Sequence, residues 1–145
     1  MAFQFSLNTV LRVRGILEEQ EERMLQKILF EIAQTVEAMA RADEEMAGLD
    51  ASRHDEVLKQ IIGNQVHDAY GKMMGLKQTR KDLEERLGKL QQLRDRQLVV
   101  YKTARQNREM LTDMREVKRG EYESDVSRRE QKTLDDNYIA RRGRN

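Results

Sequence analysis

A chain of 145 residues with no proline, 37% charged and only 5% aromatic side chains favours long helices over a globule with a thick core. The absence of cysteine excludes disulfides and thiolate metal sites, and it suits a reducing compartment. The chain also lacks a long apolar run and a cationic leader, so the sequence predicts a cytoplasmic protein without a membrane span.

The net charge of +1 hides an uneven distribution along the chain. Residues 1–72 carry 8 Lys/Arg and 13 Asp/Glu, for a net charge of −5, whereas residues 73–145 carry 19 and 13, for a net charge of +6. Opposite charge favours pairing of the two halves within one chain over association of like halves. The sequence therefore predicts a monomer in isolation.

The first residues alternate between large apolar and polar side chains before a helical period begins. The apolar members are Phe3, Phe5 and Leu7. One interpretation is a hydrophobic staple that fixes the start of the helix. The other is an anchor for a partner, because buried aromatic side chains carry much of the binding energy at interfaces.

A first helix is predicted over about residues 5–48, with one apolar face of heptad period. This seam consists of Leu25, Ile28, Ile32, Met39, Ala42, Met46 and Leu49, with Thr35 in its one polar position. A second heptad series, Val10, Leu17 and Met24, indicates a local change in supercoil. Arg14, Glu18 and Glu21 interrupt the seam, so this end should be packed least tightly and be available for another interaction.

A turn is predicted over about residues 48–65, because this segment contains Gly48, Asp50, Ser52 and Gly63, residue types that are common in turns. A second, longer helix is predicted over about residues 66–138, followed by a frayed tail over 139–145. Its seam consists of Val66, Ala69, Met73, Leu76, Leu83, Leu87 and Leu90. So narrow a seam needs a partner, and the fold class expected is all-α, an antiparallel two-helix coiled coil (a long α-hairpin) that forms a single domain.

The two predicted helices differ in length, at about 65 Å and about 110 Å for a rise of about 1.5 Å per residue. The start of the first helix should then lie near residue 110, which leaves residues 111–140 as an overhanging C-terminal helix. This overhang still carries Leu111, Met114, Val117, Tyr122, Val126, Leu134, Tyr138 and Ile139. Apolar residues on an isolated helix either fray or bind another protein.

A segment near the start of the second helix combines glycines with adaptable thioethers. Gly71 and Gly75 lie among Tyr70, Met73, Met74 and Leu76. Thioethers suit a surface that binds a partner. The alternative is that Met73 and Leu76 are ordinary seam residues.

No catalytic constellation is recognisable, and we predict neither an enzyme nor a cofactor or metal site. His54 and His67 are thirteen residues apart, which is not a ligand spacing. The basic pairs Arg128-Arg129 and Arg141-Arg142 are interleaved with acids such as Glu130, which argues against a nucleic-acid partner.

The two ends of the chain resemble those of a known family. The opening Phe3-Gln4-Phe5-Ser6-Leu7, continued by Val10-Leu11, Arg14, Glu18 and Glu19, resembles the start of the flagellar export protein FliJ family. Arg128-Arg129-Glu130-Gln131-Lys132, followed by Leu134-Asp135-Asp136 and Arg141-Arg142, resembles its close. The likeness covers essentially the whole chain.

The resemblance implies a non-catalytic stalk similar to the central stalk subunit of rotary ATPases. Its partners would be the hexameric flagellar export ATPase, the membrane export gate of the type III secretion apparatus and, in addition, export chaperones. It would lie peripherally at the inner face of the cell membrane, at the flagellar base. Contacts with the ATPase are then expected from Phe3, Phe5, Leu7, Leu11, Arg14, Glu130, Gln131, Lys132, Asp135 and Asp136, and contacts with the gate from Tyr70, Met73, Met74 and Leu76.

Three other functions are compatible with the same helices. They are the equivalent stalk of a virulence-type secretion system, a structural coiled coil that dimerises through its overhang, and a chaperone that grips clients between its helices.

Overall fold

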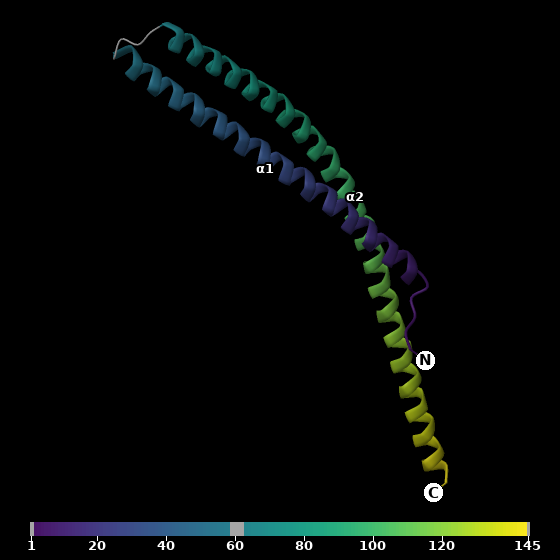
Figure 1. Cartoon of the computed structure of the whole chain (residues 1–145). Coiled ribbons are helices and arrows are strands. Elements are labelled where there is room, and N and C mark those ends of the chain that lie inside the picture. The colour runs from purple at the N-terminus through teal and green to yellow at the C-terminus, as the bar shows by residue number, and fades with distance from the viewer. Residues whose placement is uncertain (1, 59–62, 145) are drawn as a thin grey trace. The chain divides into compact units, whose positions relative to one another are not determined.

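The computed structural model describes residues 2–58 and 63–144, but not the side chains of residues 56–58 and 63–66. The described residues form two long helices, α1 (Asn8–Leu58) and α2 (Gly63–Gly143), and no strand (Figure 1). Their packing against each other confirms the predicted all-α helical hairpin. The described residues divide into two compact units, which we describe separately. One contains residues 22–58 and 63–100, and the other contains residues 2–21 and 101–144.

Both helices differ in extent from the prediction. The predicted turn over residues 48–65 is wrong in its extent, because α1 continues through Gly48 to Leu58 and α2 begins at Gly63. A glycine within a helix costs only about 1 kcal/mol relative to alanine, and the seam resumes directly after it at the half-buried Leu49. The predicted end at residue 138 and frayed tail are also wrong, because α2 extends to Gly143. That the chain forms one domain stays a prediction.

In the unit of residues 22–58 and 63–100, α1 and α2 run antiparallel, side by side (Figure 1). Arg80 of α2 donates from Nε to Oδ1 of Asp43 on α1, at 2.6 Å. The buried positions are Ile28, Ala42, Met73 and Leu90, together with Thr35. Every described member of the two predicted seams is buried or half-buried, because a heptad period keeps one face of each helix on its partner.

The polar position of the seam is satisfied within its own helix. Thr35 is only 3% exposed, and its Oγ1 donates to the backbone carbonyl of Glu31 at 2.8 Å. A buried hydroxyl without a hydrogen bond would cost about 1–3 kcal/mol. The back-bond within the helix explains why a threonine is tolerated in an otherwise apolar seam.

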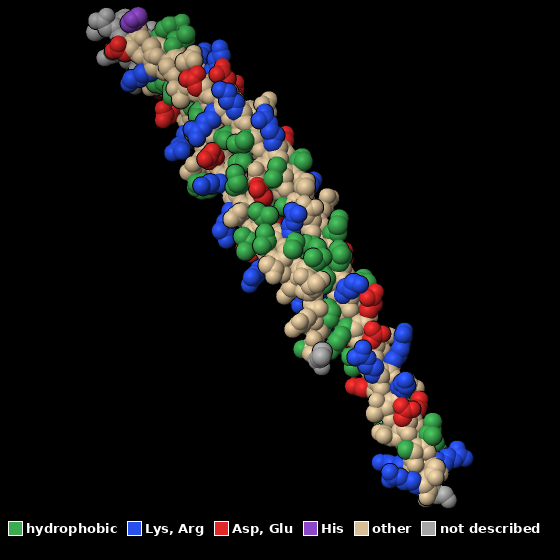
Figure 2. All heavy atoms as spheres, turned by 90° about the vertical axis from the view of Figure 1, so that its right-hand side faces the viewer, with side chains coloured by type: hydrophobic (Ala, Val, Ile, Leu, Met, Phe, Trp, Pro, Cys, Tyr) green, Lys and Arg blue, Asp and Glu red, His purple; other side chains and the backbone are tan. Residues whose placement is uncertain are grey.

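The core is one side chain wide along the hairpin. Among the described residues no large side chain is fully buried, because each helix has only one neighbour. The space-filling view shows hydrophobic side chains interleaved with basic and acidic ones on the face drawn (Figure 2). Stability therefore comes from many half-buried contacts spread along the helices.

In the unit of residues 2–21 and 101–144, the first turns of α1 pack on α2 and the residues before them continue along it. Asn8 and Leu11 of α1 line a surface hollow together with Arg115 of α2, and Phe3 contacts Tyr122. The start of α1 thus lies beside residue 115 instead of residue 110. Val126 is the last half-buried residue, and residues 127–144 are all exposed, so the overhang is shorter than the predicted 111–140.

Candidate partner-binding surfaces

The N-terminal segment, residues 2–7, is not helical and packs on α2 of its own unit. Phe3, Phe5 and Leu7 are half-buried, whereas Gln4 and Ser6 are exposed, as expected when alternate side chains of an extended chain share one face. The rings of Phe3 and Tyr122 have centroids 5.6 Å apart and are tilted by 46°. Such aromatic pairs contribute about 0.5–1.5 kcal/mol beyond the area that they bury.

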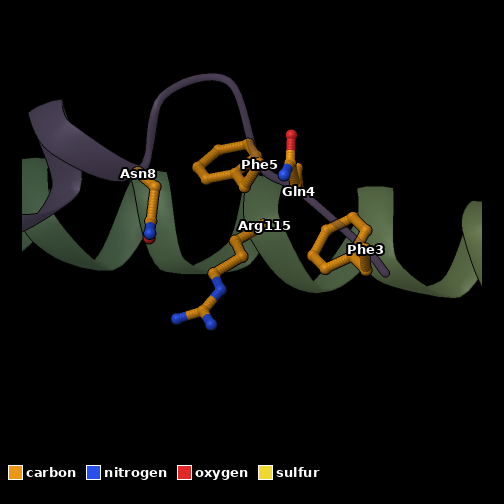
Figure 3. A pocket seen from close by; sticks show the side chains of 5 residues that line it. All are labelled: Phe3, Gln4, Phe5, Asn8 and Arg115. Atoms are coloured by element: carbon orange, nitrogen blue, oxygen red, sulfur yellow. The ribbon is translucent and has the colours of Figure 1, made fainter. Parts of the chain in front are cut away.

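Two surface hollows lie beside this segment. A hollow of about 650 Å³ lies between the segment and the α2 residues Met114, Lys118, Glu121, Tyr122 and Asp125. A second hollow of about 340 Å³ is lined by Phe3, Gln4, Phe5, Asn8 and Arg115. Figure 3 shows Phe3 and Phe5 beside the α2 ribbon, from which Arg115 extends. The segment therefore lies against α2 and leaves open surface hollows at its edges.

An ion pair links α1 and α2 at a position where the sequence predicted only an interruption of the seam. Arg108 of α2 donates from Nε to Oε2 of Glu18 at 2.6 Å and from Nη2 to Oε1 at 3.2 Å. The Glu18 side chain is 15% exposed and that of Arg108 is 31% exposed. The acid at 18 is thus part of the contact between the helices, in the way that a polar seam position can specify register.

This contact shifts the ionisation of both groups. Hydrogen bonding from Arg108 lowers the pKa of Glu18, and the positive charges of Arg108 and Arg105 act in the same direction against partial burial. The hydrogen bond to Glu18 likewise raises the pKa of Arg108. Each group therefore favours its charged form in the folded protein.

The lowered pKa of Glu18 predicts a loss of stability in acid. A carboxyl that is more acidic when folded stabilises the fold above its unfolded pKa, and this contribution disappears as the pH falls through the folded value. We expect the free energy of unfolding of wild-type protein to exceed that of Glu18→Gln at pH 7. The difference should shrink below about pH 4.5, the ordinary value for the group. Urea denaturation of both proteins between pH 7 and pH 3 measures it, and a difference that grows in acid would contradict the assignment.

The residues expected to contact the ATPase fall into two groups. Phe3, Phe5, Leu7 and Leu11 are half-buried, whereas Arg14, Glu130, Gln131, Lys132, Asp135 and Asp136 are exposed. Of the N-terminal members, Phe3 contacts Tyr122, which lies about 12 Å before Glu130 at a helical rise of about 1.5 Å per residue. Arg14 lies in α1, whereas the other exposed members, from Glu130 to Asp136, share the end of α2 with Leu134, Tyr138 and Ile139, which are also exposed.

The residues expected to contact the gate also divide. Met73 is 8% exposed and lies in the seam, so its side chain packs between the two helices. Leu76 is half-buried and lines a surface groove of about 590 Å³ with Glu45, Gly48, Leu49, Lys72, Gly75 and Thr79. Tyr70 and Met74 are 52% and 49% exposed, so these two side chains are open to a partner.

The described residues show neither a metal-binding cluster nor a membrane span. No three or more of their His, Cys, Asp or Glu side chains are arranged so that they could hold a metal ion, and both His54 and His67 are exposed. None of the described helical segments is apolar over a length that would cross a bilayer.

Comparisons with known proteins gave one family. A family model described as "Flagellar FliJ protein" matches residues 3–145. No match was found among curated proteins or among solved structures.

Proposed function

The chain belongs to the FliJ family of flagellar proteins, and on this premise we propose that it is a stalk that joins the flagellar export ATPase to the membrane export gate. Membership makes it a component of the flagellar export apparatus, in flagellar type III protein secretion. As a stalk, the chain would contact the ATPase and the gate through two separate surfaces. The stalk itself would be non-catalytic and would lie at the inner face of the membrane, at the flagellar base.

The ATPase-binding role is supported by the end of α2. Residues 127–143 are the last part of α2, and all side chains described from residue 127 to residue 144 are exposed. A single helix is about 10–12 Å across with its side chains, which is narrow enough to enter the centre of a protein ring. Glu130, Lys132, Asp135 and Asp136 can pair with charges on the ATPase, and exposed Leu134, Tyr138 and Ile139 supply apolar contacts.

This function is tested by adding the purified chain to a purified flagellar export ATPase and measuring ATP hydrolysis. A stalk that enters the ring is expected to bind it and to raise its rate of hydrolysis, whereas the chain alone should hydrolyse no ATP. Binding without any change in rate would support a passive scaffold instead.

The gate-binding role is assigned to the exposed part of the segment from Tyr70 to Leu76. Replacing Tyr70 and Met74 together by alanine is expected to weaken binding to the gate by at least roughly tenfold, since a large apolar contact residue contributes more than about 1 kcal/mol. The free energy of unfolding should change by less than about 0.5 kcal/mol for each substitution, because both side chains are half-exposed. Isothermal titration with the purified cytoplasmic part of the gate protein measures the affinity.

Two matched variants accompany this experiment. Met73→Ala should lower the thermal midpoint, because Met73 is buried in the seam. Val36→Ala, at an exposed apolar residue of α1 in the same unit, should leave gate binding unchanged. Wild-type affinity in the Tyr70→Ala/Met74→Ala protein would remove the gate contact from this segment.

A further inference from the structure

The N-terminal segment lies along one face of α2 and shields Tyr122 there, with side chains that the proposed function assigns to the ATPase. The α2 residues beneath it, Met114, Lys118, Tyr122 and Asp125, recur at intervals of three and four and thus share one helical face. Tyr122 and Val126 are half-buried, whereas all other residues from 113 to 144 are exposed. The Phe3 ring contacts Tyr122 directly, so this segment covers the end of the half-buried stretch of α2.

The contact is of a kind that can open. The segment has no helix or strand, and open surface hollows of about 650 and 340 Å³ lie beside it on α2. Its backbone is joined to α1 by hydrogen bonds from Asn8 N–H to the Phe5 carbonyl and from Leu11 N–H to the Leu7 carbonyl. A short extended segment with few buried contacts belongs to the low-stability end of a protein, where local opening requires little free energy.

We propose that residues 2–7 form a reversible intramolecular strap, which holds Phe3, Phe5 and Leu7 on α2 in the free protein and releases them to the ATPase. The inference rests on the proposed function, because it supplies the partner that exchanges with α2. While the strap is closed, the apolar side chains that would anchor the ATPase are turned to the chain's own helix. Binding then requires the open form, so the strap lowers the apparent affinity by the fraction of molecules that are open.

The aromatic pair sets the size of the expected effect. Tyr122→Ala removes the partner of Phe3 on α2, but it leaves every residue assigned to the ATPase in place. Loss of an aromatic pair shifts an equilibrium by roughly two- to tenfold. If the closed strap dominates, Tyr122→Ala is expected to tighten binding to the ATPase by the same roughly two- to tenfold.

A cross-link that keeps the strap closed tests the opposite effect, a loss of affinity for the ATPase. The chain has no cysteine, so Ala2→Cys and Asp125→Cys, both at residues that line the larger hollow, introduce the only two thiols. A short bifunctional maleimide should join them in the monomer and keep the strap closed. The matched control is Ala2→Cys with Ser124→Cys, because residue 124 is rotated by about 100° around α2 and should cross-link less.

The locked protein is expected to bind the ATPase at least roughly tenfold more weakly than the same double variant capped with a monofunctional maleimide. Circular dichroism checks that both remain equally helical. Tighter binding by Tyr122→Ala together with weaker binding by the locked protein supports the strap.

Other outcomes overturn the inference in distinguishable ways. Equal affinities for locked and capped protein, or weaker binding by Tyr122→Ala, would overturn the strap while leaving the stalk function intact. Failure of both wild-type and Tyr122→Ala protein to bind the ATPase would overturn the stalk function, and with it the strap. Equal cross-linking of the two cysteine pairs would show that residues 2–7 do not lie on this face.

Discussion

A chain that ends at Val126 is expected to lose at least about 100-fold in affinity for the export ATPase, which corresponds to about 2.7 kcal/mol. Residues 127–144 are exposed along their whole described length and carry five of the residues assigned to the ATPase. Because their side chains are not packed against α1, the shortened chain should keep the Phe3–Tyr122 contact and the Glu18–Arg108 pair. Its thermal midpoint should therefore stay close to that of the full chain.

Fluorescence anisotropy with labelled chain measures the affinity, and circular dichroism measures the midpoint. A chain that ends at Ala140 is the matched control, since it loses Arg141, Arg142 and Arg144 but keeps Glu130 to Asp136. This control should bind within about threefold of the full chain. Wild-type affinity in the chain that ends at Val126 would show that the ATPase contact lies elsewhere.

Removing one member of the Glu18–Arg108 pair is expected to destabilise its unit. Arg108→Leu leaves the mostly buried carboxylate of Glu18 without its closest cation, and loss of a buried charge partner costs about 1–3 kcal/mol. Arg105, whose charge also acts on Glu18, can offset part of this cost. Urea denaturation of the wild-type and variant proteins gives the free energies of unfolding.

The double variant Glu18→Leu/Arg108→Leu distinguishes the free energy that the ion pair contributes from the contribution of the surrounding packing. Two apolar side chains can replace a buried ion pair with little or no loss, so the double variant should recover most of the stability that Arg108→Leu loses. Their coupling energy should be at least about 0.5 kcal/mol, as for residues in direct contact. Strictly additive losses from the two single variants would mean that the pair makes no net contribution.

The periodic parts of the structure could be predicted from the sequence, because one heptad repeat determines which side of a helix is covered. Leu25, Ile32 and Leu87 lie in the seam as predicted, and Thr35 occupies its polar position. The boundaries could not be predicted as well. Gly48 suggested a turn, but a single glycine is too weak a helix breaker to end a helix whose seam continues.

Contacts between residues far apart in sequence were harder to predict. Glu18 was predicted to interrupt the seam, because its partner Arg108 is 90 positions away in the sequence. Only the opposite net charges of the two halves indicated that such a pair could form. The alternation of Phe3, Phe5 and Leu7 indicated an extended segment with one apolar side, but not that Tyr122 would face it. Of the residues proposed to contact the gate, Met73 and Met74 have the same side chain, and only their positions around α2 separate the buried one from the exposed one.

A core only one side chain wide also determines how the two helices separate on unfolding. Each turn of one helix touches only the facing turn of the other, so the free energy of unfolding is a sum over neighbouring layers, as in linear repeat arrays. Melting should then advance as in a zipper, from frayed ends inward, and the calorimetric enthalpy should exceed the van't Hoff enthalpy. Amide protons beside Ile28 and Leu90 would be the last to exchange with solvent.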